Sequence, residues 1–342
     1  TNTTHSFAVS GHGSVNLAAT TDPNSSVNPF VSVAGNHLFQ TKVNLMNSAT
    51  VNIDSDSTLV FDGVLNLMGF TLTKTGAGTM SINNRLTTAG GTVDIQQGTV
   101  AGNGTIGGDV SNEGTIAPGN SPGILTIDGN LNNGASGTIA VEIEGTSGAG
   151  DSAGHDQIQV TGSSTLDGTL SITTGSYADP TTRAARDTFR VIASAGGSTG
   201  TFGTVSYDGT DLSADFNGAN GSFRDHIANG LFRNVDYDGN NVSVTNLFAL
   251  QGDADGDKDI DITDFNILAS NFDDTGANSA TNDWTTADFD LDGDVDITDF
   301  NFLAANFADT GYITGPAGGQ VPEPGTLALL LLGGLLGFWA WR

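Results

Sequence analysis

The sequence contains no cysteine and few basic residues. Without cysteine the chain can form no disulfide, thiol nucleophile or thiolate ligand for a metal. Its 10 lysines and arginines are outnumbered by 38 aspartates and glutamates, which gives a formal net charge of -28. Because this charge repels nucleic acids and anionic membrane surfaces, we expect no nucleic-acid partner. Cations are the natural partners of such a chain.

Aromatic residues make up only 7% of the sequence, whereas glycine occurs 48 times, and this balance argues against a helical bundle. Short apolar runs alternate with polar residues instead. Ile139, Val141 and Ile143, for example, fall on one face of an extended segment, with Glu142 on the other. A period of two is typical of a half-buried strand. We therefore predict a mainly β body over residues 1–250.

Glycine-threonine pairs punctuate this body at short intervals. They begin at Gly78, Gly91, Gly98, Gly104 and Gly114. Glycine tolerates the positive φ that tight turns need. Short rungs bury their apolar faces by stacking on one another, which favours a parallel β-helix, or solenoid. A β-sandwich is the alternative, but the close spacing of the pairs leaves little room for its longer strands.

The residues from Leu72 to about Tyr207 also resemble the passenger β-strand repeats of autotransporter-type proteins. The most specific part of the resemblance is the stretch Ala-Pro-Gly-Asn-Ser-Pro-Gly at residues 117–123. It is supported by the glycine-rich run at 98–110. The resemblance implies a right-handed parallel β-helix that lies outside the cell.

Two acidic segments follow, at residues 253–264 and 288–299, and they align position by position. This spacing lets a short loop wrap oxygen ligands around a hard cation, and Ca²⁺ fits better than Mg²⁺, which prefers fewer protein ligands in strict octahedral geometry. A solvated acidic surface is the alternative, but it does not explain the duplication. The predicted ligands of two Ca²⁺ sites are Asp253, Asp255, Asp257, Asp259, Asp261 and Asp264, and Asp288, Asp290, Asp292, Asp294, Asp296 and Asp299.

Each loop has further features that lead to structural expectations. Asp259 and Asp294, at loop position 7, are expected to offer their backbone carbonyls, and Ile260 and Val295, at position 8, to join the two loops by apolar contact. Lys258 occupies position 6, where glycine is usual, so we expect a strained turn and weaker binding in the first loop. Apolar residues at helical spacing predict one amphipathic helix after each loop: Phe265, Leu268 and Phe272, then Phe300, Leu303 and Phe307.

A calcium loop followed by one helix, present twice, resembles the type I dockerin repeat. The resemblance implies a small α module at residues 251–312 that recognises a cohesin-like partner through loop positions 10 and 11. These positions hold Ile262, Thr263, Ile297 and Thr298. The basic residue often found about one helical turn later in dockerins is absent. Cohesin binding therefore stands beside a second interpretation, a self-contained calcium clasp that folds onto the end of the solenoid.

The end of the sequence has the features of a sorting signal. After a linker at 313–320, the motif Val321, Pro322, Glu323 and Pro324 precedes an apolar stretch that ends in Arg342. This order resembles the PEP-CTERM signal, which implies recognition and removal by a membrane exosortase-type peptidase. The apolar stretch predicts a C-terminal transmembrane helix within 321–342, so we expect an exported protein, anchored in the membrane transiently or permanently. Because the sequence begins with Thr1, it is expected to be a fragment or to have lost a signal peptide.

No arrangement of residues suggests catalysis, and we expect no enzymatic activity. The five histidines occur singly, and His155 beside Asp156 fits a turn better than an acid–base pair. Arg183, Arg186 and Arg190 are expected to be solvated. The sequence favours a structural or adhesive surface protein. The alternatives are a dockerin-bearing component of a polysaccharide-degrading system and a carbohydrate-binding module.

Overall fold

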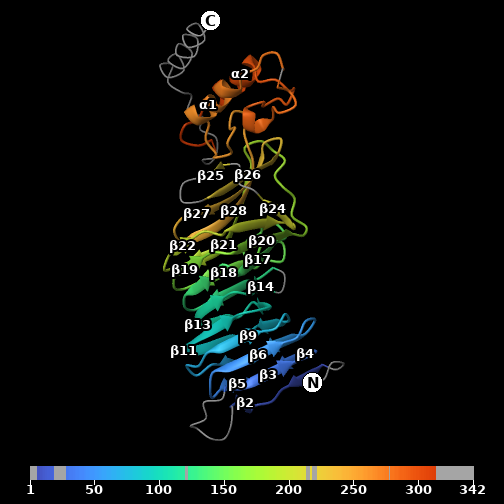
Figure 1. Cartoon of the computed structure of the whole chain (residues 1–342), viewed down its shortest axis with the longest axis vertical. Coiled ribbons are helices and arrows are strands. Elements are labelled where there is room, and N and C mark those ends of the chain that lie inside the picture. The colour runs from blue at the N-terminus through green and yellow to red at the C-terminus, as the bar shows by residue number, and fades with distance from the viewer. Residues whose placement is uncertain are drawn as a thin grey trace.

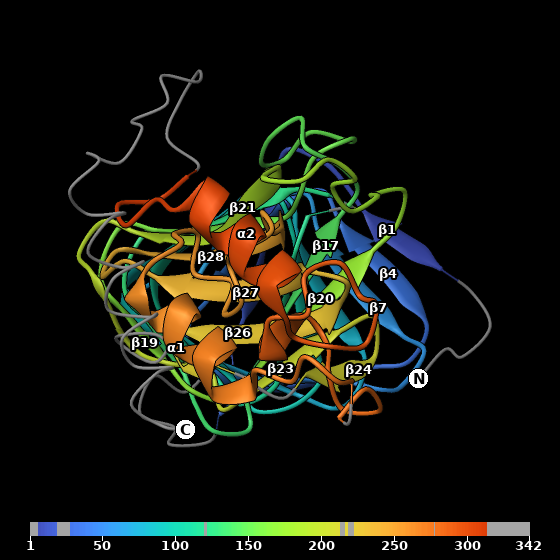
Figure 2. The same ribbon diagram turned by 90° about the horizontal axis from the view of Figure 1, so that it is seen from above.

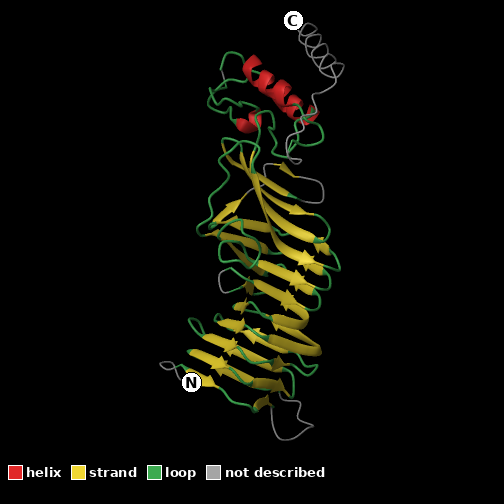
Figure 3. Ribbon diagram, turned by 180° about the vertical axis from the view of Figure 1, so that it is seen from behind, coloured by secondary structure: helices red, strands yellow, loops and turns green. Residues whose placement is uncertain are grey.

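The computed structural model describes residues 6–18, 28–119, 122–212, 216–217, 222–276 and 278–312. Over these residues the protein is mainly β, with parallel strands stacked along one long axis (Figure 1). The described helices lie together at the C-terminal end of this stack (Figure 3). The C-terminal helix that the sequence predicts within 321–342 lies outside the described residues.

The strands resolve into three parallel stacks, so that each turn of the chain adds one strand to each stack. The first stack is β1 (Phe7–Val9), β4 (Asn36–Phe39), β7 (Thr58–Phe61), β10 (Thr79–Ile82), β12 (Thr99–Gly102), β14 (Thr115–Pro118), β17 (Thr138–Ile143), β20 (Thr169–Thr174) and β23 (Thr204–Tyr207). An antiparallel strand, β24 (Thr210–Leu212), ends it.

The other two stacks share the long strands β11 (Arg85–Ile95) and β13 (Thr105–Asn112). The second stack also holds β2 (Ser14–Leu17), β5 (Lys42–Leu45), β8 (Leu65–Asn66), β15 (Ile124–Ile127), β18 (Gln157–Val160) and β21 (Arg186–Ser194). The third also holds β3 (Phe30–Val33), β6 (Ala49–Ile53), β9 (Leu72–Thr75), β16 (Leu131–Asn133), β19 (Ser164–Leu166) and β22 (Ser198–Gly200).

This arrangement confirms the predicted β-helix-like body, and the β-sandwich alternative is wrong. A sandwich consists of antiparallel sheets. In this chain the three stacks pair in parallel, and antiparallel pairing of named strands enters only at the C-terminal end of the described coil. The right-handed sense of the coil stays a prediction.

Aliphatic side chains fill the interior in aligned columns. Met80 pairs with Val100, Val100 with Ile116, and Ile116 with Ile139, each in parallel register. These four side chains are completely buried, because strand alternation turns every second residue toward the axis. The period-two pattern of the sequence therefore becomes a continuous apolar core.

The glycine-threonine pairs mark the point where many rungs enter the first stack. Thr79, Thr99 and Thr115 occupy one column of that stack, each directly after its glycine. A Cβ on Gly78 would press against the carbonyl oxygen of Asp54 in the previous rung, and a Cβ on Gly98 against that of Gly76. Glycine is therefore needed because neighbouring backbones pass very close to one another.

Polar residues interrupt the core at a few places. Lys74 is completely buried in line with Ile95, and burial lowers its pKa to about 8. Its ammonium group donates hydrogen bonds to the carbonyl oxygens of Thr75, Gly76 and Gln97 at 2.7–3.0 Å. These bonds offset the cost of burying the charge.

The C-terminal end of the coil is closed by the antiparallel strands β25 (Phe216–Asn217), β26 (Phe223–Ala228), β27 (Leu231–Tyr237) and β28 (Asn241–Phe248), with β28 paired to β21. Residues 251–312, here called the acidic module, follow. They contain α1 (Ile262–Asn271), the short 3-10 helix η2 (Trp284–Thr286) and α2 (Ile297–Asn306). Seen from above, α1 and α2 lie over the closing strands (Figure 2).

We predict that Gly78→Ala will lower the free energy of unfolding by about 1–3 kcal/mol, because the methyl group forces two rungs apart. Gly13→Ala is the matched control, since no atom lies within 4 Å of its Cβ position. The control should change stability by less than about 0.5 kcal/mol. Chemical denaturation of both variants checks the prediction, and equal effects would contradict it.

Candidate functional site

The two acidic loops fold around the beginnings of α1 and α2. Asp261 caps α1, accepting a hydrogen bond from the Thr263 amide at 2.6 Å. Asp264, in the first turn, accepts from the amides of Asp261 at 2.9 Å and Ala254 at 2.7 Å. This last carboxylate therefore ties the start of the loop to the start of the helix.

The second loop repeats these contacts. Asp296 accepts from Thr298 at 2.6 Å, and Asp299 accepts from Asp296 at 2.9 Å and Phe289 at 2.7 Å. The duplication seen in the sequence is therefore a duplication of hydrogen bonds. Each helix begins at loop position 10, within the predicted ligand set.

Carboxylate oxygens gather in four groups of three, within 4.8 Å of one another in each group. Asp264 belongs to both groups of the first loop, and Asp299 to both groups of the second. Asp257 and Asp292 belong to none of these groups. The groups are Asp253, Asp255 and Asp264; Asp259, Asp261 and Asp264; Asp288, Asp290 and Asp299; and Asp294, Asp296 and Asp299.

Several of these oxygens are buried without a hydrogen-bond donor among the described residues. They are Oδ1 of Asp259, Asp288 and Asp294. Asp288 as a whole is only 1% exposed. A buried carboxylate oxygen without a donor is costly, and a hard divalent cation would satisfy it. Because the side chains of Asp259 and Asp294 join the groups, position 7 offers a carboxylate in addition to the backbone carbonyl that the sequence predicts.

Crowding raises the proton affinity of these groups. Burial raises the pKa of Asp264 to about 7 and that of Asp299 to about 6. Burial, followed by repulsion from Asp257, raises the pKa of Asp255 to about 6. The pKa of the fully buried Asp253 is also well above its usual range, mainly through burial. The negative charge of the loops is therefore unfavourable without a positive partner.

Ile260 and Val295, which were predicted to join the two loops, form their backbone pairs with other segments. Ile260 pairs with Ala308, which follows α2, through two backbone hydrogen bonds of 3.0 and 2.9 Å. Val295 pairs with Asp273, which follows α1. Each loop therefore joins the segment after the other helix, although Ile260 and Val295 share one core cluster. Sequence spacing predicted the apolar role but did not reveal this crossed pairing.

The acidic module shares that core with the β-helix. Phe232 of β27 and Leu247 of β28 pack in the same cluster as Ile260, Leu268 and Trp284. The Trp284 indole donates a 2.7 Å hydrogen bond to the backbone carbonyl of Asp253, at the start of the first loop. A lone tryptophan in an acidic segment gave no signal in the sequence for this role.

Arg183 also lies at the contact between the acidic module and the β-helix. The prediction that its side chain is solvated is wrong. Its guanidinium lies between the rings of Phe248 and Trp284, 4.1 Å from each ring centroid. It also donates to the carbonyl oxygens of Asn229 at 2.8 Å and Ala249 at 3.2 Å. Stacked between two rings, the guanidinium serves as a packing element.

The position-6 residues both adopt the left-handed conformation, with φ of 80° at Lys258 and 96° at Gly293. Lysine is disfavoured there, as the sequence predicts. The Lys258 ammonium pairs with Asp236 of β27 at 3.2 Å, so its charge is directed toward the β-helix.

The residues predicted to bind a partner are exposed at the beginnings of the helices. Ile262 is 54% exposed and Ile297 60% exposed, and Thr263 and Thr298 beside them are exposed as well. Large apolar side chains with this much exposure leave a surface available for contact.

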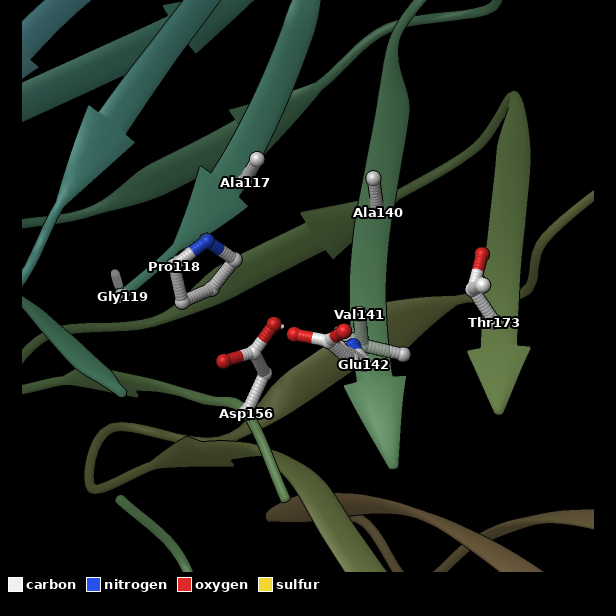
Figure 4. Close-up of a pocket in the computed structure, with 8 residues that line it drawn as sticks. All are labelled: Ala117, Pro118, Gly119, Ala140, Val141, Glu142, Asp156 and Thr173. Atoms are coloured by element: carbon white, nitrogen blue, oxygen red, sulfur yellow. Dashed lines mark hydrogen bonds between the residues drawn. The ribbon is translucent and has the colours of Figure 1, made fainter. Parts of the chain in front are cut away.

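A separate hollow of about 350 Å³ lies on the β-helix, between β14, β17 and β20, and brings Glu142 near Asp156 (Figure 4). Asp156 is 4% exposed, and its two oxygens accept the amides of Gly123 at 2.6 Å and Glu142 at 2.9 Å. The carboxylate thus fastens the segment before β18 to two neighbouring rungs. This is the turn role that the sequence predicts.

Asp156 should make stability depend on pH. Burial raises its pKa to about 6, so between about pH 4 and pH 6 the folded chain holds a proton that the unfolded chain has released. Its stabilising contribution is full below this window and falls as pH rises through it.

We therefore predict that the free energy of unfolding of the wild type, minus that of Asp156→Asn, is more positive at pH 4 than at pH 7, by up to about 3 kcal/mol. Denaturation in EDTA at both pH values measures the difference. Asp211→Asn, an exposed change in β24, should show no such trend. A difference that grows as pH rises would contradict the prediction.

Comparison with protein families identifies one match, to the PEP-CTERM protein-sorting motif, over residues 320–342. The motif contains the predicted Val321, Pro322, Glu323 and Pro324. It indicates an exported protein that is sorted to the cell surface. It is a signal recognised by exosortase, which is consistent with the predicted exosortase-type partner. These residues lie outside the described part of the structure, and within that part no helix is long and apolar enough to cross a membrane. A comparison with curated proteins gives no match.

Proposed function

We propose that this chain is a non-enzymatic surface protein in which a β-helix carries a dockerin-like module that binds two calcium ions. The observation that carries the proposal is the buried, donor-free Oδ1 of Asp288, a residue whose carboxylate lies in a group with those of Asp290 and Asp299. A divalent cation would satisfy such an oxygen. The first loop has an equivalent group of three carboxylates, from Asp253, Asp255 and Asp264.

Calcium is the cation that best fits these loops. Ca²⁺ accepts six to eight oxygen ligands in flexible geometry, whereas Mg²⁺ requires a strict octahedron and retains water. The raised pKa values of Asp264 and Asp299 support binding of a divalent cation, because its charge would neutralise the crowded carboxylates. Calcium is abundant outside cells, where the sorting motif directs the protein.

Two roles for the module are compatible with these contacts. The core shared by Phe232 and Trp284 supports an intramolecular clasp that closes the C-terminal end of the β-helix. The exposed Ile262 and Ile297 support docking of a cohesin-like protein. We favour the clasp as the primary role, because the first loop is already packed against the closing strands, and we retain docking as a second role of the exposed surface. The body would then serve as a structural or adhesive scaffold at the cell surface.

Calorimetric titration of the full chain with Ca²⁺ tests the proposal. We expect two ions per wild-type chain. Asp299→Asn should weaken binding in the second loop at least about tenfold, because it removes a negative charge from both oxygen groups. Asp211→Asn should still bind two ions.

Thermal unfolding supplies an independent measurement. At a free calcium concentration of about 100 times the dissociation constant, each ion should stabilise the folded state by about 2.7 kcal/mol. The wild type should therefore melt at a lower temperature in EDTA. No heat of binding at millimolar calcium, together with unchanged melting in EDTA, would refute the proposal.

A further inference from the structure

The two loops have unequal surroundings. The first loop lies against the β-helix, where a Cβ on Gly256, at loop position 4, would meet the ring of Phe232. The same position in the second loop holds Leu291, which is 42% exposed. The difference between glycine and leucine at one position therefore follows from the contact with the closing strands.

Arg224 of β26 reaches into the first loop. One nitrogen of its guanidinium lies 3.2 Å from Oδ1 of Asp255 and donates to the Asp255 carbonyl oxygen at 2.8 Å. The side chains of the pair are only 15% and 12% exposed. Such a pair is much less screened by solvent than a surface ion pair. Asp255 also belongs to the group of three carboxylates that contains Asp253 and Asp264.

Other groups of the chain satisfy the first aspartate of this loop. Asp253 accepts from the amides of Gly256 at 2.6 Å and Lys258 at 3.2 Å, and from the Tyr312 hydroxyl at 2.7 Å.

The second loop has no comparable side-chain partners among the described residues, although the Gly293 amide donates to Asp288 at 3.0 Å, as the Lys258 amide does to Asp253. Asp288, which corresponds to Asp253, has one oxygen without a donor. Asp290, which corresponds to Asp255, is exposed, and no ion pair of the described residues involves the second loop.

We propose that Arg224 is the built-in counter-cation of the first loop and lowers its affinity for calcium. This inference rests on the proposed calcium function. An ion that enters the first loop competes with the guanidinium for Asp255, whereas the carboxylates of the second loop form no ion pair with the described residues. The second loop therefore fills first. Filling of the first loop then changes the contact between the acidic module and β26, which couples ion binding to the junction with the β-helix.

The test uses Asp299→Asn to weaken the second loop, so that calcium binding reports mainly on the first loop. The calcium affinity and melting temperature of this variant are then compared with those of the double variant that also carries Arg224→Gln. Removing the competing charge should tighten calcium binding at least about tenfold, because unit charges a few ångströms apart interact more strongly in a partly buried site than in bulk water. The same change should lower the melting temperature in EDTA, because it removes the counter-charge that stabilises the ion-free loop. Arg186→Gln, at an exposed position of β21, is the matched control and should alter neither value.

The direction of the affinity change separates the possible outcomes. If Arg224 only holds the loop in shape, Arg224→Gln will weaken calcium binding or leave it unchanged, and either result overturns the inference. If Asp299→Asn alone binds no calcium, recovery of binding on adding Arg224→Gln supports the inference, and no recovery overturns it. A wild-type chain that binds no calcium refutes the proposed function itself. A wild-type chain that binds two ions with equal affinity overturns only the present inference.

Discussion

Carboxylates crowd at the junction between the β-helix and the acidic module, and this crowding constrains the whole C-terminal end. Asp253, Asp264, Asp288 and Asp299 are each no more than 1% exposed. Burying so many negative charges close together is unfavourable unless backbone amides, basic side chains or metal ions compensate the charge. The first loop draws on Arg224 and the Tyr312 hydroxyl, whereas the second lacks such partners among the described residues. The contacts of Arg224 and Tyr312 with the first loop, and the proposed ion sites, meet this requirement.

The β-helix supplies the other half of the junction. Its aliphatic columns stack in register through the coil and would end on apolar side chains such as Phe232 and Leu247. The acidic module covers these side chains with Trp284, Ile260 and Leu268, and Arg183 is held between rings from both parts. An apolar end that would otherwise face water thus becomes part of a shared core. A secreted protein without disulfides depends more heavily on such contacts.

Features set by local spacing could be predicted from the sequence, and long-range contacts could not. Alternation at Ile139 and Val141 indicated strands, and the glycine-threonine pairs at Gly78 and Gly98 indicated tightly stacked rungs. Of the twelve predicted aspartate ligands, all but Asp257 and Asp292 fall into the four oxygen groups, and their binding of calcium stays a prediction. The pairing of Ile260 with Ala308 joins residues on different repeats, and no local pattern encodes it.

The basic residues at the junction were the clearest failure of sequence reasoning. A lone arginine in a polar segment is usually solvated. Arg183 departs from that rule because distant segments bring two aromatic rings to its guanidinium. No role was predicted for Arg224, which pairs with Asp255 of the first loop. Their roles depend on partners that lie far along the chain, which sequence spacing does not reveal.

The most direct test of the central claim is a crystal structure of the calcium-loaded chain, with anomalous scattering used to locate the ions. The account predicts two peaks, one within reach of Asp253, Asp255 and Asp264 and the other within reach of Asp288, Asp290 and Asp299. Crystals grown in millimolar calcium with no ion in either loop, and with both loops folded as described here, would contradict it.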